Sequence, residues 1–116
     1  MEATIKAICE GFSEGNFTDA YPHFDEHIQW QLIGNDVISG KDKVIAACDK
    51  MLKEMAGSKL VNTDVTEGDD RVAVEGYCNY TTAEQVAMQV QFCDVYATIG
   101  EKIQKITSYC IDSVIK

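Results

Sequence analysis

The sequence has few basic residues and no closely spaced pair of cysteines. Ten lysine and arginine residues stand against 19 acidic ones, so the net charge is -9. The field of such a chain disfavours binding to nucleic acid or to an anionic membrane surface, whereas neutral or cationic small molecules remain admissible. The five cysteines are spread along the chain and never spaced as Cys-x-x-Cys. This usage predicts reduced, buried thiols and a cytoplasmic protein.

Long hydrophobic runs and ligand-binding loops are also absent. No segment is long and apolar enough to predict a transmembrane helix, and the first residues lack the pattern of a secretory signal. Gly68 and Gly100 are isolated turn residues, so no phosphate-binding loop is predicted. His23 and His27 have a spacing that binds zinc on a helix, but Pro22 and a predicted strand at His27 interrupt that helix. We therefore expect no membrane segment, metal or cofactor.

The pattern of apolar residues predicts a single domain over residues 1–116. Of these 116 residues, 46% are hydrophobic, enough for one stable core. Helical spacing predicts helices over residues 3–14 and 41–56, with a short irregular helix between residues 17 and 24. Alternating apolar residues predict strands over residues 27–33, 59–67, 71–83, 86–99 and 102–115. Helices first and strands last indicate an α+β fold, in which the long helix covers one face of a curved antiparallel sheet.

One acidic residue is unusual for its position in the strand predicted over residues 86–99. Alternation places Asp94 on the same face as Val90, Phe92 and Tyr96. Because an ionised carboxylate is costly to desolvate, Asp94 must be hydrogen-bonded, paired or shifted towards its neutral form. Asp94 is therefore either a functional group in a pocket or a structural carboxylate, and a register error of one residue would turn it outward.

Several segments together resemble the nuclear transport factor 2-like superfamily, and within it the SnoaL-like polyketide cyclases and ketosteroid isomerases. The similar segments are Glu-Gly-Asn-Phe at 14–17, Phe-Asp-Glu-His-Ile-Gln-Trp at 24–30, and residues 38–44, 92–96 and 100–106. The resemblance implies a cone-shaped half-barrel, whose three N-terminal helices close an apolar pocket over the concave face of the sheet. It also implies a homodimer through the outer face of the sheet.

The outward residues of the strand at 86–99 independently favour this dimer. They include Ala87, Cys93, Val95, Ala97 and Ile99. A contiguous patch of such side chains is too apolar to face water, so we expect a second copy of the chain to cover it.

The resemblance also allows particular reactions to be tested against the residues. Ketosteroid isomerases use a tyrosine, a carboxylate base and a second aspartate. The last of these falls on Asp94, but the other two fall on Ile8 and on Gln31 or Leu32. Limonene epoxide hydrolase uses an Asp-Arg-Asp relay, whereas Arg71, the only arginine, follows a predicted turn. What remains is similar to the simpler SnoaL-like arrangement, in which a pocket aspartate transfers a proton next to a carbonyl.

The expected site therefore centres on Asp94 as acid or base, with Tyr96 orienting a substrate oxygen. The expected cavity wall comprises Trp30, Met51, Met55, Tyr80, Phe92, Ser108 and Cys110. Core packing is the alternative role for the aromatic and methionine residues. Asp112 is a reserve candidate, provided that the last strand turns Ile106, Ser108 and Cys110 inward.

These residues predict a cofactor-free isomerase, cyclase or lyase that acts on a small hydrophobic molecule. The alternative is a non-catalytic module that binds a hydrophobic ligand or serves only for dimerisation.

Overall fold

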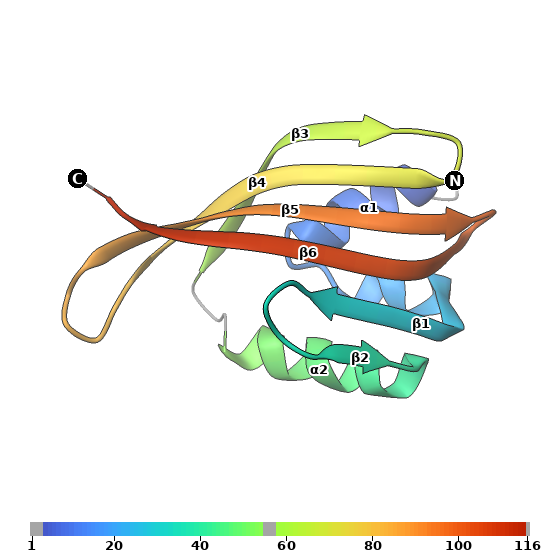
Figure 1. Ribbon diagram of the computed structural model, residues 1–116, viewed down its shortest axis with the longest axis horizontal. Coiled ribbons are helices and arrows are strands. Elements are labelled where there is room, and N and C mark those ends of the chain that lie inside the picture. Colours follow the sequence, from blue (N-terminus) through green and yellow to red (C-terminus); the bar gives the residue numbers. More distant parts are fainter. Residues whose placement is uncertain (1–3, 55–57, 116) are drawn as a thin grey trace.

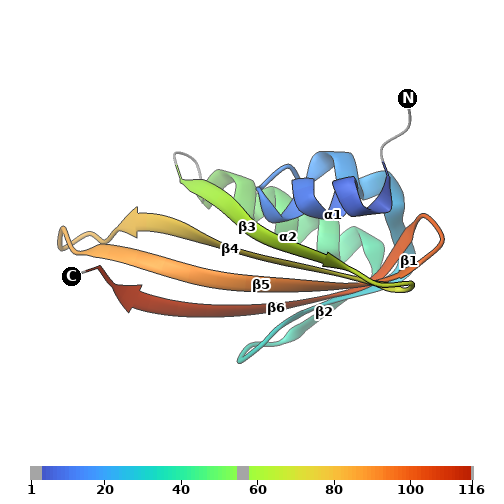
Figure 2. The ribbon, with the colours of Figure 1, turned by 90° about the horizontal axis from the view of Figure 1, so that it is seen from above.

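The helices of the protein lie together on one face of a curved sheet, as Figures 1 and 2 show from two directions. The computed structural model describes residues 4–54 and 58–115. Its elements are α1 (Ile5–Ser13), the 3-10 helix η1 (Thr18–His23), β1 (Phe24–Leu32), β2 (Val37–Ser39), α2 (Lys41–Glu54), β3 (Lys59–Glu67), β4 (Arg71–Thr81), β5 (Ala87–Ile99) and β6 (Lys102–Val114). None of the described helices is long and apolar enough to cross a membrane. The α+β fold expected from the sequence is confirmed.

The sheet is mixed rather than wholly antiparallel. Its strand order is β2-β1-β6-β5-β4-β3, and the meander from β3 to β6 is antiparallel as expected. Strand β1 lies beside the last strand, β6, and the two run in the same direction, so this pair is parallel. The unpredicted strand β2 pairs with β1 over three residues, too few to give an alternating pattern in the sequence.

The amino-terminal helix brings its apolar stripe onto the concave face of the sheet. The Thr4 side chain caps α1 by accepting a hydrogen bond from the backbone N–H of Ala7. Gly15, with φ of 95°, ends the helix as the sequence predicted. The buried stripe ends in Phe12 and the neighbouring Ser13. The Phe12 ring packs against four other aromatic rings, whose centroids lie 4.6 to 6.1 Å away.

A glycine in β4 makes room for an aromatic side chain on the concave face. Gly76 lies opposite Phe92 in the register of β4 and β5. A Cβ atom at residue 76 would collide with the Phe92 ring and with the carbonyl oxygen of Val61. The missing side chain therefore lets Phe92 lie across β4 towards the site described below.

Candidate active site

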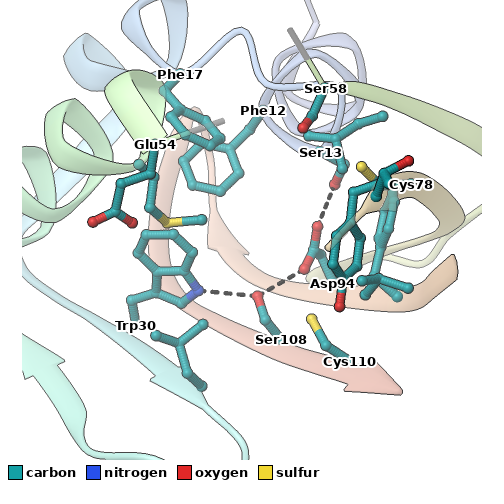
Figure 3. A pocket seen from close by; sticks show the side chains of 17 residues that line it. Phe12, Ser13, Phe17, Trp30, Glu54, Ser58, Cys78, Asp94, Ser108 and Cys110 are labelled. Atoms are coloured by element: carbon teal, nitrogen blue, oxygen red, sulfur yellow. Dashed lines mark hydrogen bonds between the residues drawn. The ribbon is translucent and has the colours of Figure 1, made fainter. Parts of the chain in front are cut away.

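A cavity of about 470 Å³ lies between the concave face of the sheet and the helices. This volume is within the range of small-molecule sites. Its walls come from α1, α2 and all strands except β2, and most of the lining side chains are aromatic, aliphatic or sulfur-containing. Figure 3 shows these side chains surrounding the carboxylate of Asp94. The cavity therefore combines a largely apolar interior with one buried carboxylate.

Most residues expected at the site do line the cavity. They are Trp30, Met51, Tyr80, Phe92, Asp94, Ser108 and Cys110. Met55 lies outside the described residues. The last strand does turn Ile106 and Ser108 inward, but Asp112 is exposed and is not among the lining residues.

The structure adds lining residues that the sequence did not single out. On the helices these include Phe12, Ser13 and Glu54, and on the strands Leu60 and Cys78. For Ser13 a signal was available, since it follows Cys9 by four residues on the buried stripe of α1. From the sequence alone, a serine in that position cannot be distinguished from a small residue that the core tolerates, because its partner on the sheet is not known.

Asp94 accepts a hydrogen bond at each carboxylate oxygen. The Ser108 hydroxyl donates to Oδ1 at 2.7 Å and the Ser13 hydroxyl donates to Oδ2 at 2.8 Å. Trp30 Nε1–H in turn donates to Ser108 Oγ at 2.9 Å. Figure 3 shows this chain running from Trp30 through Ser108 and Asp94 to Ser13. Two neighbouring strands, β1 and β6, and helix α1 thus hold the carboxylate in a fixed orientation.

Tyr96 lies behind the cavity wall rather than in it. Its side chain is fully buried, and its hydroxyl forms a hydrogen bond with Ser13 Oγ. Because Ser13 uses its only proton for Asp94, the Tyr96 hydroxyl must be the donor when the carboxylate is ionised. The alternation along β5 suggested that Tyr96 shares the pocket with Asp94. This expectation is wrong, because Tyr96 is not among the residues that line the cavity. The depth of α1 against the sheet explains the difference, since Phe12 and Ser13 lie between Tyr96 and the cavity.

The directions of the hydrogen bonds suit an ionised Asp94. Tyr96 donates to Ser13 and Trp30 donates to Ser108, while both serines donate to the carboxylate. Every proton in this network points towards Asp94, and no donor among the four is left over. Burial nevertheless raises the pKa of Asp94, although the bonds from Ser108 and Ser13 oppose this shift. The carboxyl group can therefore exchange a proton closer to neutral pH than an exposed aspartate can.

The thiols near the site are held in their neutral form. Burial raises the pKa of Cys9 and of Cys48 to about 12. The pKa of Cys110, on the cavity wall, is raised by burial and then by the charges of Asp94 and Asp112. Because the thiolate is the nucleophilic form, the raised pKa values disfavour nucleophilic chemistry at these thiols.

Comparison with known proteins agrees with this architecture. The SnoaL-like domain family matches residues 5–106, and the chain belongs to this family. An NTF2-like protein of unknown function from Cytophaga hutchinsonii ATCC 33406 is 42% identical, with a TM-score of 0.86 over 90% of this chain and 93% of that chain. A search among curated proteins finds no match.

Two more distant structures share the fold at low sequence identity. The epoxide hydrolase/cyclase-like enzyme SalBIII, of pyran ring formation in salinomycin, is 18% identical, with a TM-score of 0.74 over 96% of this chain and 95% of that chain. A protein assigned as a SnoaL-like polyketide cyclase, from Jannaschia sp. CCS1, is 12% identical, with the same TM-score over 95% and 90% of the two chains.

Proposed function

We propose that this SnoaL-like domain binds a small hydrophobic molecule in its cavity and catalyses proton transfer with Asp94, without a cofactor. The observation that carries the proposal is a buried carboxylate on the inner wall of an apolar cavity of about 470 Å³. Such surroundings raise the pKa towards the range in which a group works as general acid or base. Trp30, Met51, Tyr80, Phe92 and Cys110 form the proposed binding wall.

Asp94 and Ser108 together can supply a base and then an oxyanion donor. In the proposed step, a C–H bond next to a substrate carbonyl breaks and its proton passes to Asp94 Oδ1, while the electron pair moves to the carbonyl oxygen. The new carboxyl proton is donated to Ser108 Oγ. The Ser108 proton, no longer needed by the carboxylate, turns to the developing oxyanion. Tyr96 is proposed as a positioning residue, because it holds Ser13 with the proton towards Asp94.

One observation supports the non-catalytic alternative. Both oxygens of Asp94 already accept hydrogen bonds from serines, which is what a purely structural carboxylate needs. A protein of that kind would bind hydrophobic molecules in the same cavity and transfer no proton. The two functions differ in turnover rather than in binding.

Proton transfer can be measured with 2-tetralone, a small bicyclic ketone, as probe. We expect the wild-type protein to accelerate deuterium incorporation next to its carbonyl in D2O, followed by NMR. Ser108→Ala should lower this rate by roughly tenfold or more, because the oxyanion donor is lost. Ser113→Ala is the matched control, since Ser113 lies on the same strand and is exposed. Binding of the ketone without any acceleration by the wild type would favour the non-catalytic alternative.

We also propose that two copies of the chain associate through the outer face of the sheet, which no described helix covers (Figure 2). Ile99, Tyr109 and Ile111 are exposed there, to 63%, 47% and 68%. Sedimentation at micromolar concentration is expected to show a dimer, whereas a single species of 12.9 kDa would contradict it.

The five free cysteines support a reducing compartment, which we propose is the cytoplasm.

A further inference from the structure

Over residues 4–54 and 58–115, no basic side chain forms an ion pair with the carboxylate inside the cavity. The described ion pairs join Lys6 to Glu10 and Lys50 to Glu54, both on exposed helix surfaces. Neither reaches Asp94. The cavity lining contains Asp94 and Glu54 but no lysine, arginine or histidine among the residues that the structure describes. An unpaired buried carboxylate is costly, so a cation that entered this cavity would remove an existing penalty.

The hydrogen-bond network leads to the same conclusion independently of charge. Both serines donate to Asp94, while Trp30 donates to Ser108 and Tyr96 to Ser13. With every proton committed in this way, the network offers no donor to a ligand as long as Asp94 is ionised. What the network leaves free are the remaining lone pairs of Asp94 and one lone pair on each of the two serine hydroxyls. While Asp94 is ionised, and before any proton transfer frees the Ser108 proton, a ligand group must donate hydrogen bonds to gain a partner at the inner wall. A carboxylate or phosphate would meet only acceptors there.

The walls around Asp94 are also suited to a positive charge. Phe12, Phe17, Trp30 and Phe92 line the cavity with aromatic rings, whose faces attract cations. The net charge of -9 would attract a cationic ligand from a distance and repel an anionic one. Lys53 and Lys59 adjoin the rim in the sequence, but both are exposed and neither lines the cavity.

We propose that the ligand of this cavity is a small hydrophobic molecule that carries a protonated amine, and that the amine binds Asp94. This inference rests on the proposed function in that the cavity must bind small hydrophobic molecules, and it names their chemical class. The ammonium group supplies both missing elements, a positive charge and several N–H donors, at the one inner carboxylate.

The test compares three probes with one apolar body: 1-adamantylmethylamine, 1-adamantylmethanol and adamantane-1-carboxylate. At pH 7 the first is a cation, the second is neutral and the third is an anion. Binding is followed by calorimetry and by the fluorescence of Trp30, the only tryptophan, which lines the cavity. We expect the amine to bind wild type roughly tenfold or more tightly than the alcohol, and the carboxylate most weakly.

Two variants identify the carboxylate responsible. Asp94→Asn is expected to reduce the affinity for the amine to about that for the alcohol. Glu54→Gln is the matched control and should keep the preference, because Glu54 is exposed at the rim and paired with Lys50. Equal or tighter binding of the alcohol or the carboxylate to wild type would overturn the inference and leave the proposed acid-base function standing. A preference lost in Glu54→Gln but kept in Asp94→Asn would also overturn it. If none of the three probes bound, the proposed binding function would fail as well.

Discussion

Asp94→Asn is expected to reduce the rate of proton exchange into 2-tetralone by roughly 10²-fold or more while the fold remains intact. The amide has nearly the shape of the carboxylate, but it cannot accept a proton at catalytic pH. Its oxygen can still accept from Ser13, and its NH2 group can donate to Ser108, whose own proton then turns into the cavity. We therefore expect the free energy of unfolding at pH 7 to change by less than about 1 kcal/mol.

The stability of the two proteins should depend on pH in different ways. Because burial raises the pKa of Asp94 in the folded state, the folded protein binds a proton at a pH where the unfolded chain does not. Wild type therefore gains stability relative to Asp94→Asn as the pH falls from 7 towards 4, and loses it as the pH rises through the folded-state pKa. Denaturant unfolding of both proteins at several pH values measures the difference.

A structural carboxylate would give another result. If Asp94 were ionised and served only to hold Ser13 and Ser108, the variant would lose roughly 1 to 3 kcal/mol at neutral pH, because weaker neutral hydrogen bonds would replace two charge-assisted ones. Exchange into the ketone would then be as slow in wild type as in the variant. That pair of results would exclude Asp94 as a catalytic group.

Ser13→Ala is expected to destabilise the domain by roughly 2 to 5 kcal/mol, the largest loss of any single hydroxyl in the site. The change removes the acceptor of the fully buried Tyr96 hydroxyl and one of the two donors to Asp94. Loss of the bond from Ser13 should also raise the pKa of Asp94 further, since this bond lowers it. Denaturant unfolding measures the first effect, and carboxyl 13C NMR of Asp94 across pH measures the second.

A double-mutant cycle separates the two causes of that loss of stability, the Tyr96 hydroxyl left without an acceptor and the missing donor to Asp94. Tyr96→Phe removes the buried hydroxyl that Ser13→Ala leaves without an acceptor, so the double variant should regain roughly 1 to 2 kcal/mol relative to Ser13→Ala. The raised pKa of Asp94 should persist in the double variant, because the donor from Ser13 is still missing. Additive losses would mean that the hydroxyls of Ser13 and Tyr96 do not depend on each other.

The sequence predicted the elements of the fold well because most of them repeat a local pattern. The four strands of the meander match their predicted ranges to within two residues, and the alternation through Phe92 and Tyr96 placed Asp94 on the buried face. A strand of 13 residues with one face in the core carries enough repeats to fix its register. The family resemblance gave the arrangement of helices over the sheet.

What the sequence could not provide was the pairing of distant segments. The parallel pair of β1 and β6 leaves no periodic signal, because alternation within a strand does not identify its neighbour. The same limit hid the role of Ser13, which is an ordinary small residue on α1 until the helix packs over Asp94. Tyr96 was assigned to the cavity because the alternation along β5 shows on which face of the sheet a side chain lies. It does not show that Phe12 and Ser13 of α1 cover Tyr96.

Two of the three hydrogen bonds that hold Asp94 join parts of the chain that lie far apart in the sequence. The bond from Ser13 to Asp94 closes a separation of 81 residues, and the bond from Trp30 to Ser108 closes one of 78. The meander from β3 to β6, by contrast, forms through neighbouring hairpins. Closing long loops is the slow part of folding, because chain entropy is lost before the distant contacts form. The hairpins should therefore assemble first during folding and bring Ser108 to Asp94. The bonds from Ser13 to Asp94 and from Trp30 to Ser108 should form only when α1 and β1 dock.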